Sequence, residues 1–192
     1  MVVTILTLLP QYIIAFAAVF GAWAAWSAWK PQQLSKRKFE VALDLKIGLR
    51  RLQDEMAAAT NPLVPIDGPI EQWSESLNDR FNTKVKNVLE AYNNTAESRM
   101  LAETFLCKEV QDAIDEVKSV LIEYRNTVDD FLIFQGQPEL LVDDEKFNQA
   151  RRLELIHAHP NQDNFFSQLS SSIEKVEELL LPTLNLHKVT GT

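Results

Sequence analysis

The sequence predicts an all-α protein: one N-terminal transmembrane helix followed by an antiparallel bundle of four to five helices. Three observations predict this fold class. No charged side chain occurs between Val2 and Trp29. Beyond residue 30, apolar residues recur at helical spacing, and no stretch alternates with the period of two that marks a strand. The 192 residues include only five glycines and eight prolines, which favours long helices over a many-turned sheet.

The uncharged N-terminal stretch has the length of a membrane-spanning helix. About 20 residues, each rising about 1.5 Å, cross a hydrocarbon core of about 30 Å. Pro10 suits the first turn of a helix, so the regular span is expected from Gln11 to Trp29. The alternatives are a buried soluble helix and a secretory signal peptide. A signal peptide needs basic residues before its apolar core, whereas the first Lys or Arg here is Lys30. We therefore expect an uncleaved transmembrane anchor over residues 1–30.

Aromatic and basic residues flank the end of this predicted span. Three indoles recur at i, i+3 and i+6, where amphipathic rings prefer the membrane interface. The predicted membrane-interface residues are Trp23, Trp26, Trp29, Lys30, Lys36, Arg37 and Lys38. Residues 30–51 hold seven basic and two acidic side chains, a net charge of +5. Basic residues beside a span stay in the cytoplasm, so we expect a single-pass protein with its N-terminus outside and its C-terminal domain in the cytoplasm.

The next three segments follow from apolar spacing and from proline. Residues 31–59 are expected to form a basic juxtamembrane helix, which Pro31 should bend away from the span. Three prolines and a glycine predict a Pro-rich loop over residues 60–69. A second helix should begin near Ile70. Its apolar stripe comprises Trp73, Leu77, Phe81, Val85, Val88 and Tyr92.

The third helix is expected to be long. Asn94 followed by Glu97 resembles an N-cap with its partner at N3, and the helical period continues until Gly136 stops it. The same period places Cys107 inside this helix, and with no histidine near it in sequence we expect a small core residue.

Two further helices complete the predicted bundle. Acidic residues at 143–145 indicate the first turn of a fourth helix, which runs to about His157. Asp163 precedes a fifth helix that Pro182 should close, and residues 183–192 are expected to be a poorly ordered tail. The bundle is therefore expected over residues 70–182, with residues 31–59 packed on it.

One motif offers catalytic or metal-binding chemistry. Glu154 and His157 have the Glu-x-x-His spacing of carboxylate-bridged di-iron bundles. Such a centre needs a second copy of the motif and two further inward glutamates, and the sequence has no second copy. We therefore predict no catalytic residue, no metal and no cofactor.

The charge distribution limits the classes of partner. The whole chain carries −8, so the +5 of residues 30–51 leaves −13 for residues 52–192. A strongly acidic domain repels phosphate backbones, so nucleic acid is not an expected partner. We expect a non-enzymatic protein-interaction or scaffolding module at the cytoplasmic face. Its partners would be the lipid bilayer and a protein or second copy, and small-molecule binding stays open.

Two other functions remain as alternatives. One is an enzyme with a site between helices near Glu154 and His157. The other is a small membrane-active modulator from a mobile element.

Three pieces of sequence resemble an uncharacterised group of small bacterial membrane proteins, some of them found in phage-derived regions. The pieces are Trp26-Ser27-Ala28-Trp29, Lys36-Arg37-Lys38-Phe39-Glu40-Val41-Ala42-Leu43 and Glu177-Glu178-Leu179-Leu180-Leu181-Pro182-Thr183-Leu184. The resemblance implies an N-terminal span, a basic helix, a Pro-rich loop, a long helical pair and a final helix. It also implies location in the bacterial inner (plasma) membrane, and it carries no activity or site.

Overall fold

The computed structural model describes residues 2–61, 73–135, 152, 156 and 164–189. Side chains are described in these ranges except at 2–13, 15, 73–77, 134–135 and 186–189. Every element in the described ranges is a helix, which confirms the all-α part of the prediction. The helices are α1 (Val2–Thr60), α2 (Trp73–Asn93), α3 (Ala96–Phe105), α4 (Lys108–Gln135) and α6 (Phe165–Val189).

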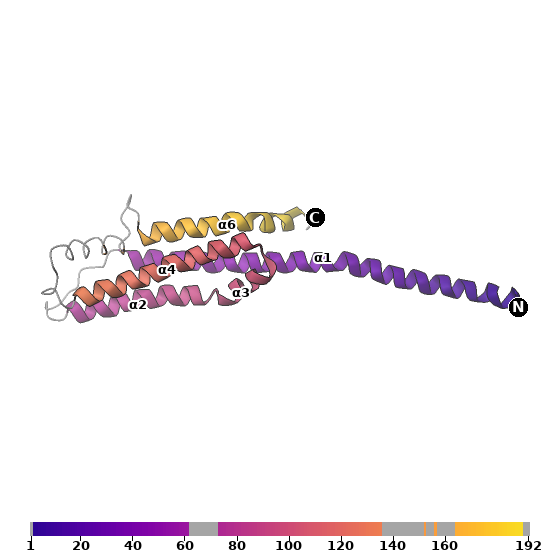
Figure 1. The fold of residues 1–192 in the computed structure, drawn as a ribbon, viewed down its shortest axis with the longest axis horizontal. Helices are drawn as coiled ribbons and strands as arrows, with labels where there is room; N and C mark the ends of the chain where they lie inside the picture. Colours follow the sequence, from indigo (N-terminus) through magenta and orange to yellow (C-terminus); the bar gives the residue numbers. More distant parts are fainter. Residues whose placement is uncertain (1, 62–72, 136–151, 153–155, 157–163, 190–192) are drawn as a thin grey trace.

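The second half of α1 lies in a bundle with the other helices, and its first half projects beyond them (Figure 1). In the bundle, α1 lies against α6, α2 and α3, and α4 lies against α6, α2 and α3. The chain direction alternates, so α2 and α6 run antiparallel to α1 and α4 (Figure 1). We call the projecting part of α1, residues 2–37, the arm.

The core lies between the apolar stripes of α1, α2, α4 and α6. The stripe of α1 begins at Val41 and is repeated every three or four residues, as a helix with 3.6 residues per turn requires. Its fully or almost fully buried members are Val41, Ala42, Leu45, Leu49, Leu52, Met56 and Ala59. From α2, Phe81, Val85, Val88 and Tyr92 of the predicted stripe are buried. Burying each such large side chain contributes about 1.5–3 kcal/mol, so these stripes hold the bundle together.

Among the described residues, no helix is long and apolar enough to cross a membrane. This finding contradicts the predicted transmembrane anchor over residues 1–30. It equally contradicts the single-pass topology and the inner-membrane location that depended on the anchor.

The helix α1 also continues through Pro31, where the sequence predicts a bend between two helices. Proline lacks the N–H that would bond to the carbonyl four residues earlier. Residues 21–37 are all exposed, so water can bond to that carbonyl and the helix need not end.

The predicted long third helix is instead two helices, α3 and α4. Leu106 is extended, with φ −106° and ψ 174°, and its N–H donates to the carbonyl of Ala102 over 2.9 Å. The carbonyl of Cys107 then accepts the N–H of Val110, which starts α4. Cys107 is exposed at this junction, so the prediction of a core cysteine is wrong. The N-cap of α3 is Thr95 rather than Asn94, and its side chain makes no capping bond.

The last helix begins as predicted but ends later. Asn164 Oδ1 accepts the N–H of Ser167, and Ser167 Oγ accepts the N–H of Asn164, both over 3.0 Å. These reciprocal bonds form a capping box at the start of α6. The helix runs through Pro182 to Val189, so its predicted end at Pro182 is wrong, as is a tail that begins at 183. Pro182 is exposed, and Leu184 in the next turn still packs against the core.

Three sequence predictions fall outside the described residues. They are the loop over 60–69 beyond Asn61, the second helix's start near Ile70 and most of the fourth helix, including Glu154 and His157. Within that fourth helix only Arg152 and Ile156 are described; both are helical, and Ile156 is fully buried.

Candidate functional site

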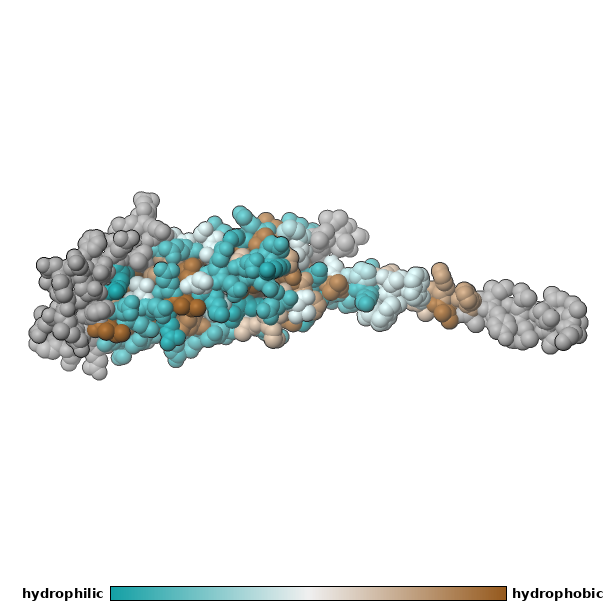
Figure 2. Space-filling model, in the orientation of Figure 1, coloured by the Kyte–Doolittle hydropathy of each residue, from teal (hydrophilic) through white to brown (hydrophobic). Residues whose placement is uncertain are grey.

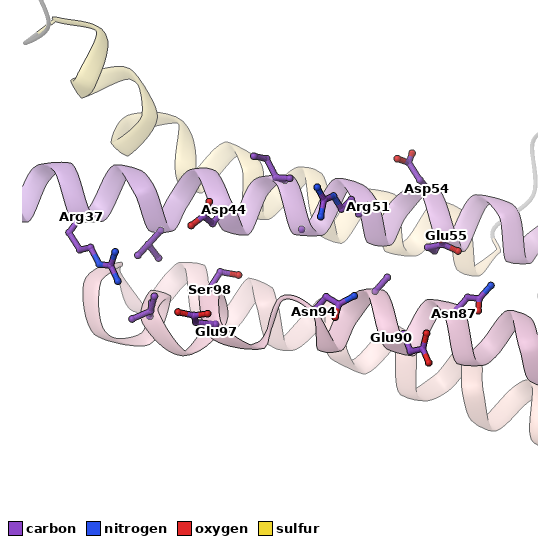
Figure 3. Close-up of a pocket in the computed structure, with 15 residues that line it drawn as sticks. Arg37, Asp44, Arg51, Asp54, Glu55, Asn87, Glu90, Asn94, Glu97 and Ser98 are labelled. Atoms are coloured by element: carbon purple, nitrogen blue, oxygen red, sulfur yellow. The ribbon is translucent and has the colours of Figure 1, made fainter.

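A polar groove of about 850 Å³ lies between α1 and the end of α2 with α3 (Figure 3). Five carboxylates and two guanidinium groups line it, so its net charge is negative. Its polar lining residues are Arg37, Asp44, Arg51, Asp54, Glu55, Asn87, Glu90, Asn94, Glu97 and Ser98. The carboxylates spread along the groove rather than converge, and Asp54 points away from the others (Figure 3). In the described part of the chain, no three His, Cys, Asp or Glu side chains are placed to hold a metal ion.

The close approach of α1 to the α2–α3 turn shapes this groove. A Cβ atom on Gly48 would lie 2.6 Å from Thr95 Cγ2. Thr95 is buried, its Oγ1 donates to the carbonyl of Tyr92 over 2.7 Å, and it accepts from Arg99 Nε over 3.0 Å. The Arg99 guanidinium also lies 3.8 Å from the centre of the Tyr92 ring. Burial raises the pKa of Tyr92 despite this neighbouring cation. The turn is therefore a packed structural unit, and the one hydroxyl among the groove-lining residues, that of Ser98, donates to the carbonyl of Thr95.

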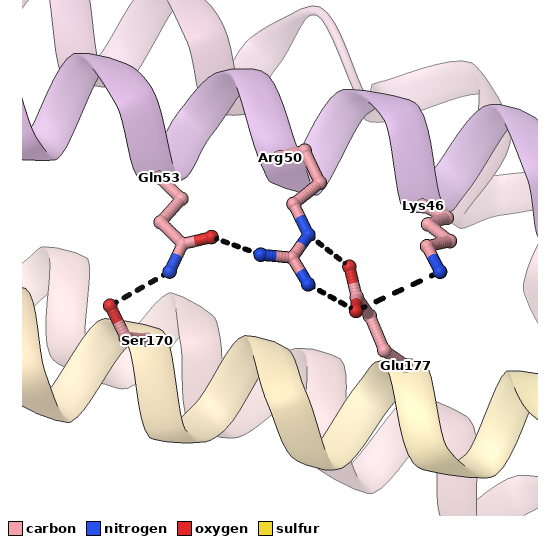
Figure 4. Close-up of polar contacts among 5 residues, drawn as sticks. All are labelled: Lys46, Arg50, Gln53, Ser170 and Glu177. Atoms are coloured by element: carbon pink, nitrogen blue, oxygen red, sulfur yellow. Dashed lines mark hydrogen bonds and ion pairs between the residues drawn. The ribbon is translucent and has the colours of Figure 1, made fainter.

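On the other side of α1, a ladder of polar contacts joins it to α6 (Figure 4). Arg50 holds both carboxylate oxygens of Glu177, with Nη2 2.6 Å from Oε2, and Lys46 Nζ lies 3.8 Å from the same oxygen. Arg50 also donates to Gln53, which donates in turn to Ser170 Oγ over 3.0 Å. The hydrogen bond and the charge of Glu177 raise the pKa of Arg50. These basic residues of the predicted juxtamembrane helix are thus engaged within the bundle.

The arm carries a large exposed apolar surface. Every described arm side chain is exposed. Its large apolar members, with their exposed fractions, are Ile14 68%, Phe16 77%, Val19 71%, Phe20 61%, Trp23 62%, Trp26 59%, Trp29 49% and Leu34 47%. In Figure 2 the described part of the arm beside its grey end is brown, and a paler stretch separates it from the bundle. Elsewhere on the described surface, exposed large apolar side chains such as Met100 and Ile133 are scattered.

All seven predicted interface residues lie on α1, where six are exposed and Lys38 is half-buried. Two of the indoles contact each other: the ring centroids of Trp26 and Trp29 are 5.4 Å apart, with their planes tilted by 37°. Arg37 lies 3.3 Å from Glu40 in an exposed ion pair, and Lys36 lies 4.0 Å from the same residue. Their role at a membrane interface is not tested by these contacts and stays a prediction.

Five large apolar side chains of the arm continue the core stripe of α1, and Trp29 lies outside it. At 3.6 residues per turn, Phe16, Val19, Phe20, Trp23 and Trp26 fall within an arc of about 120°. This arc is continuous with the face of α1 that enters the core from Val41 onward. We call these five residues the aromatic face. The helical spacing of these five residues is present in the sequence. The sequence analysis interpreted the tryptophans as membrane-interface residues and missed their continuity with the core stripe.

Comparisons of the chain with protein-family models, with curated proteins and with solved structures gave no match. The resemblance to small bacterial membrane proteins therefore stays a prediction.

Proposed function

We propose that this protein is a non-enzymatic protein-interaction module and that the arm is its binding element. The observation that supports this proposal is the unbroken run of exposed apolar residues from Phe16 to Trp26. Scattered exposed apolar residues are normal on a protein surface, whereas contiguous patches of several hundred Å² mark interaction sites.

The size of this surface is sufficient to drive association. Five aromatic rings on the arm, each exposed by 49–77%, present about 600 Å² in total, since a ring side chain carries about 150–250 Å². At about 25 cal/mol per Å², covering them gains about 15 kcal/mol before any cost. Association costs about 4–15 kcal/mol, so the gain reaches the upper end of that cost.

The polar groove is the weaker candidate. Its described lining contains no histidine or cysteine, and Ser98 donates to a backbone carbonyl rather than to a general base. The enzyme alternative near Glu154 and His157 concerns residues outside the described ranges. A binding role for the arm therefore has the more direct support.

Photo-crosslinking tests the proposal in cells that produce the full chain. A benzophenone amino acid replaces Phe20 on the aromatic face, and in a control it replaces Ala18, an exposed residue about 160° around the helix. We expect discrete protein adducts from position 20 that are absent or much weaker at position 18. Equal adducts at both positions, or no protein adduct from position 20, would contradict the proposal.

A further inference from the structure

We propose that the partner of the arm is a second copy of this chain, which pairs with it antiparallel through the aromatic face. This inference rests on the proposed function and names its partner.

Most of the large apolar side chains of the arm lie on one side. The aromatic face carries five of them, with exposed fractions of 59–77%. The opposite side carries the small residues Ala18, Gly21 and Ala25 together with Ile14 and Trp29. A Cβ on Gly21 would meet nothing within 4 Å, so no other described part of the chain covers that position. A helix with one large apolar face buries that face against a partner.

The area of the aromatic face fits a pair of identical chains. Its four aromatic side chains together expose about 500 Å². Two copies that cover them fully would bury about 1,000 Å², which is the lower bound for a specific interface. The same patch on both copies gives an isologous contact with two-fold symmetry, the commonest arrangement of soluble oligomers.

The distribution of charge selects the antiparallel orientation. A parallel pair would place Lys30, Lys36 and Arg37 beside the same residues of the second copy. It would also bring together two acidic segments, residues 52–192, of −13 each. An antiparallel pair places each basic cluster beside residues 2–9 of the second copy, which carry no charged side chain, and puts the bundles at opposite ends. Like charges held close together are destabilising, so the antiparallel pair is favoured.

This orientation also sets a register. A pair centred between Val19 and Phe20 brings Phe16 of one copy level with Trp23 of the other. Residues 2–37 of the two arms then overlap along their length, so the bundle ends lie about 50 Å apart at 1.5 Å per residue. The α3–α4 junction lies close to the point where α1 leaves the bundle (Figure 1). Cys107, the one cysteine of the sequence, belongs to this junction and is exposed.

Sedimentation equilibrium of the full chain tests the pairing. We expect a mass of twice 21.9 kDa. We expect the double substitution F20E/W23E to weaken the pair by about 100-fold or more, because it buries two unpaired charges at the centre of the contact. The matched control A18E/A25E adds the same charges on the opposite side and should leave the pair intact. Helix content by circular dichroism shows that both variants fold.

A wild-type chain that stays monomeric at every concentration would overturn the inference. So would equal loss of pairing in both double variants, or a monomer whose aromatic face binds neutral phosphatidylcholine vesicles instead. The proposed function would survive a monomeric result if position 20 still crosslinks to a different protein, so the two failures are distinguishable.

Spin labels on Cys107 test the orientation. In the pair we expect a distance of about 50 Å between the two labels, as the overlap of the arms requires. A distance below about 30 Å would place the bundles side by side and overturn the antiparallel arrangement.

Discussion

Gly48 lies where α1 packs against the α2–α3 turn. A methyl group there would lie 2.6 Å from Thr95 Cγ2, and Thr95 is buried and bonded to Tyr92 and Arg99. Because the turn cannot move without losing these bonds, G48A should lower the free energy of unfolding by about 1–3 kcal/mol. Urea denaturation measures the change.

The arm offers a matched control for that prediction. Gly21 is also helical, but a Cβ there meets nothing within 4 Å. We expect G21A not to lower the free energy of unfolding, since alanine is favoured over glycine in a helix by about 1 kcal/mol. Equal destabilisation by both substitutions would show that the contact with Thr95 is not the cause.

Tyr124 has a buried hydroxyl with no hydrogen-bond partner among the described residues, and its ring packs edge-on against Phe165 at 5.6 Å. Burial raises its pKa to about 12, whereas the unfolded chain ionises near pH 10. The folded form therefore keeps the proton longer, and stability is lost as the pH rises from 10 to 12.

The substitution Y124F removes this alkaline loss. We expect Y124F to match or exceed the wild type in stability at neutral pH, since it removes an unpaired buried hydroxyl. At pH 11 the free energy of unfolding of the variant, relative to the wild type, should be about 1 kcal/mol higher than at pH 7. Denaturation at pH 7 and pH 11 measures both values, and a large loss at pH 7 would indicate an unseen partner for the hydroxyl.

At the scale of elements, Glu177 is the centre of the α1–α6 contact. Its side chain is 12% exposed and accepts two bonds from Arg50, with Lys46 nearby. We expect E177Q to lower the free energy of unfolding by about 1 kcal/mol, because the pair is bidentate and shielded on the carboxylate side. Thermal unfolding at low and high salt measures it, and the loss should shrink in salt.

An exposed ion pair serves as the control for E177Q. Lys86 and Glu90 lie 3.7 Å apart on one turn of α2, and both are well exposed. We expect E90Q to cost no more than about 0.5 kcal/mol. If the two variants lose equal stability, the polar contacts between α1 and α6 add no stability beyond that of an exposed ion pair.

Elements with a clear apolar stripe could be predicted from the sequence, and their ends could not. The stripe of α2 is buried from Phe81 to Tyr92, because the helical period alone decides which side chains face a core. The break at Leu106 has no glycine or proline to mark it. Helix ends were expected at Pro31 and Pro182, but both helices continue. A missing helical hydrogen bond costs least where the helix is exposed.

The candidate site could be predicted only in part. The tryptophans of the arm are exposed. The spacing of apolar residues along a helix is the same whether or not other helices cover that face. Which part of α1 is covered depends on where α3, α4 and α6 end in space, and that depends on long-range packing. The spacing of the aromatic face can therefore be found in the sequence, but its exposure cannot.

For the whole molecule, the division of α1 between bundle and arm is the feature with the greatest consequence. Its 59 residues span about 88 Å, and only the part from Val41 onward enters the core. Helices owe most of their stability to packing of an apolar face. The described side chains of the arm have no such packing within their own chain, and the proposed pairing would supply it.

Amide hydrogen exchange, followed as a function of protein concentration, tests this account most directly. At low concentration we expect residues 14–34 to exchange quickly and residues 41–60 to be protected, since only the latter pack in the core. As the concentration rises and the aromatic faces pair, protection of 14–34 should increase while that of 41–60 stays constant. Exchange in 14–34 that does not change with concentration would contradict the pairing of the arms.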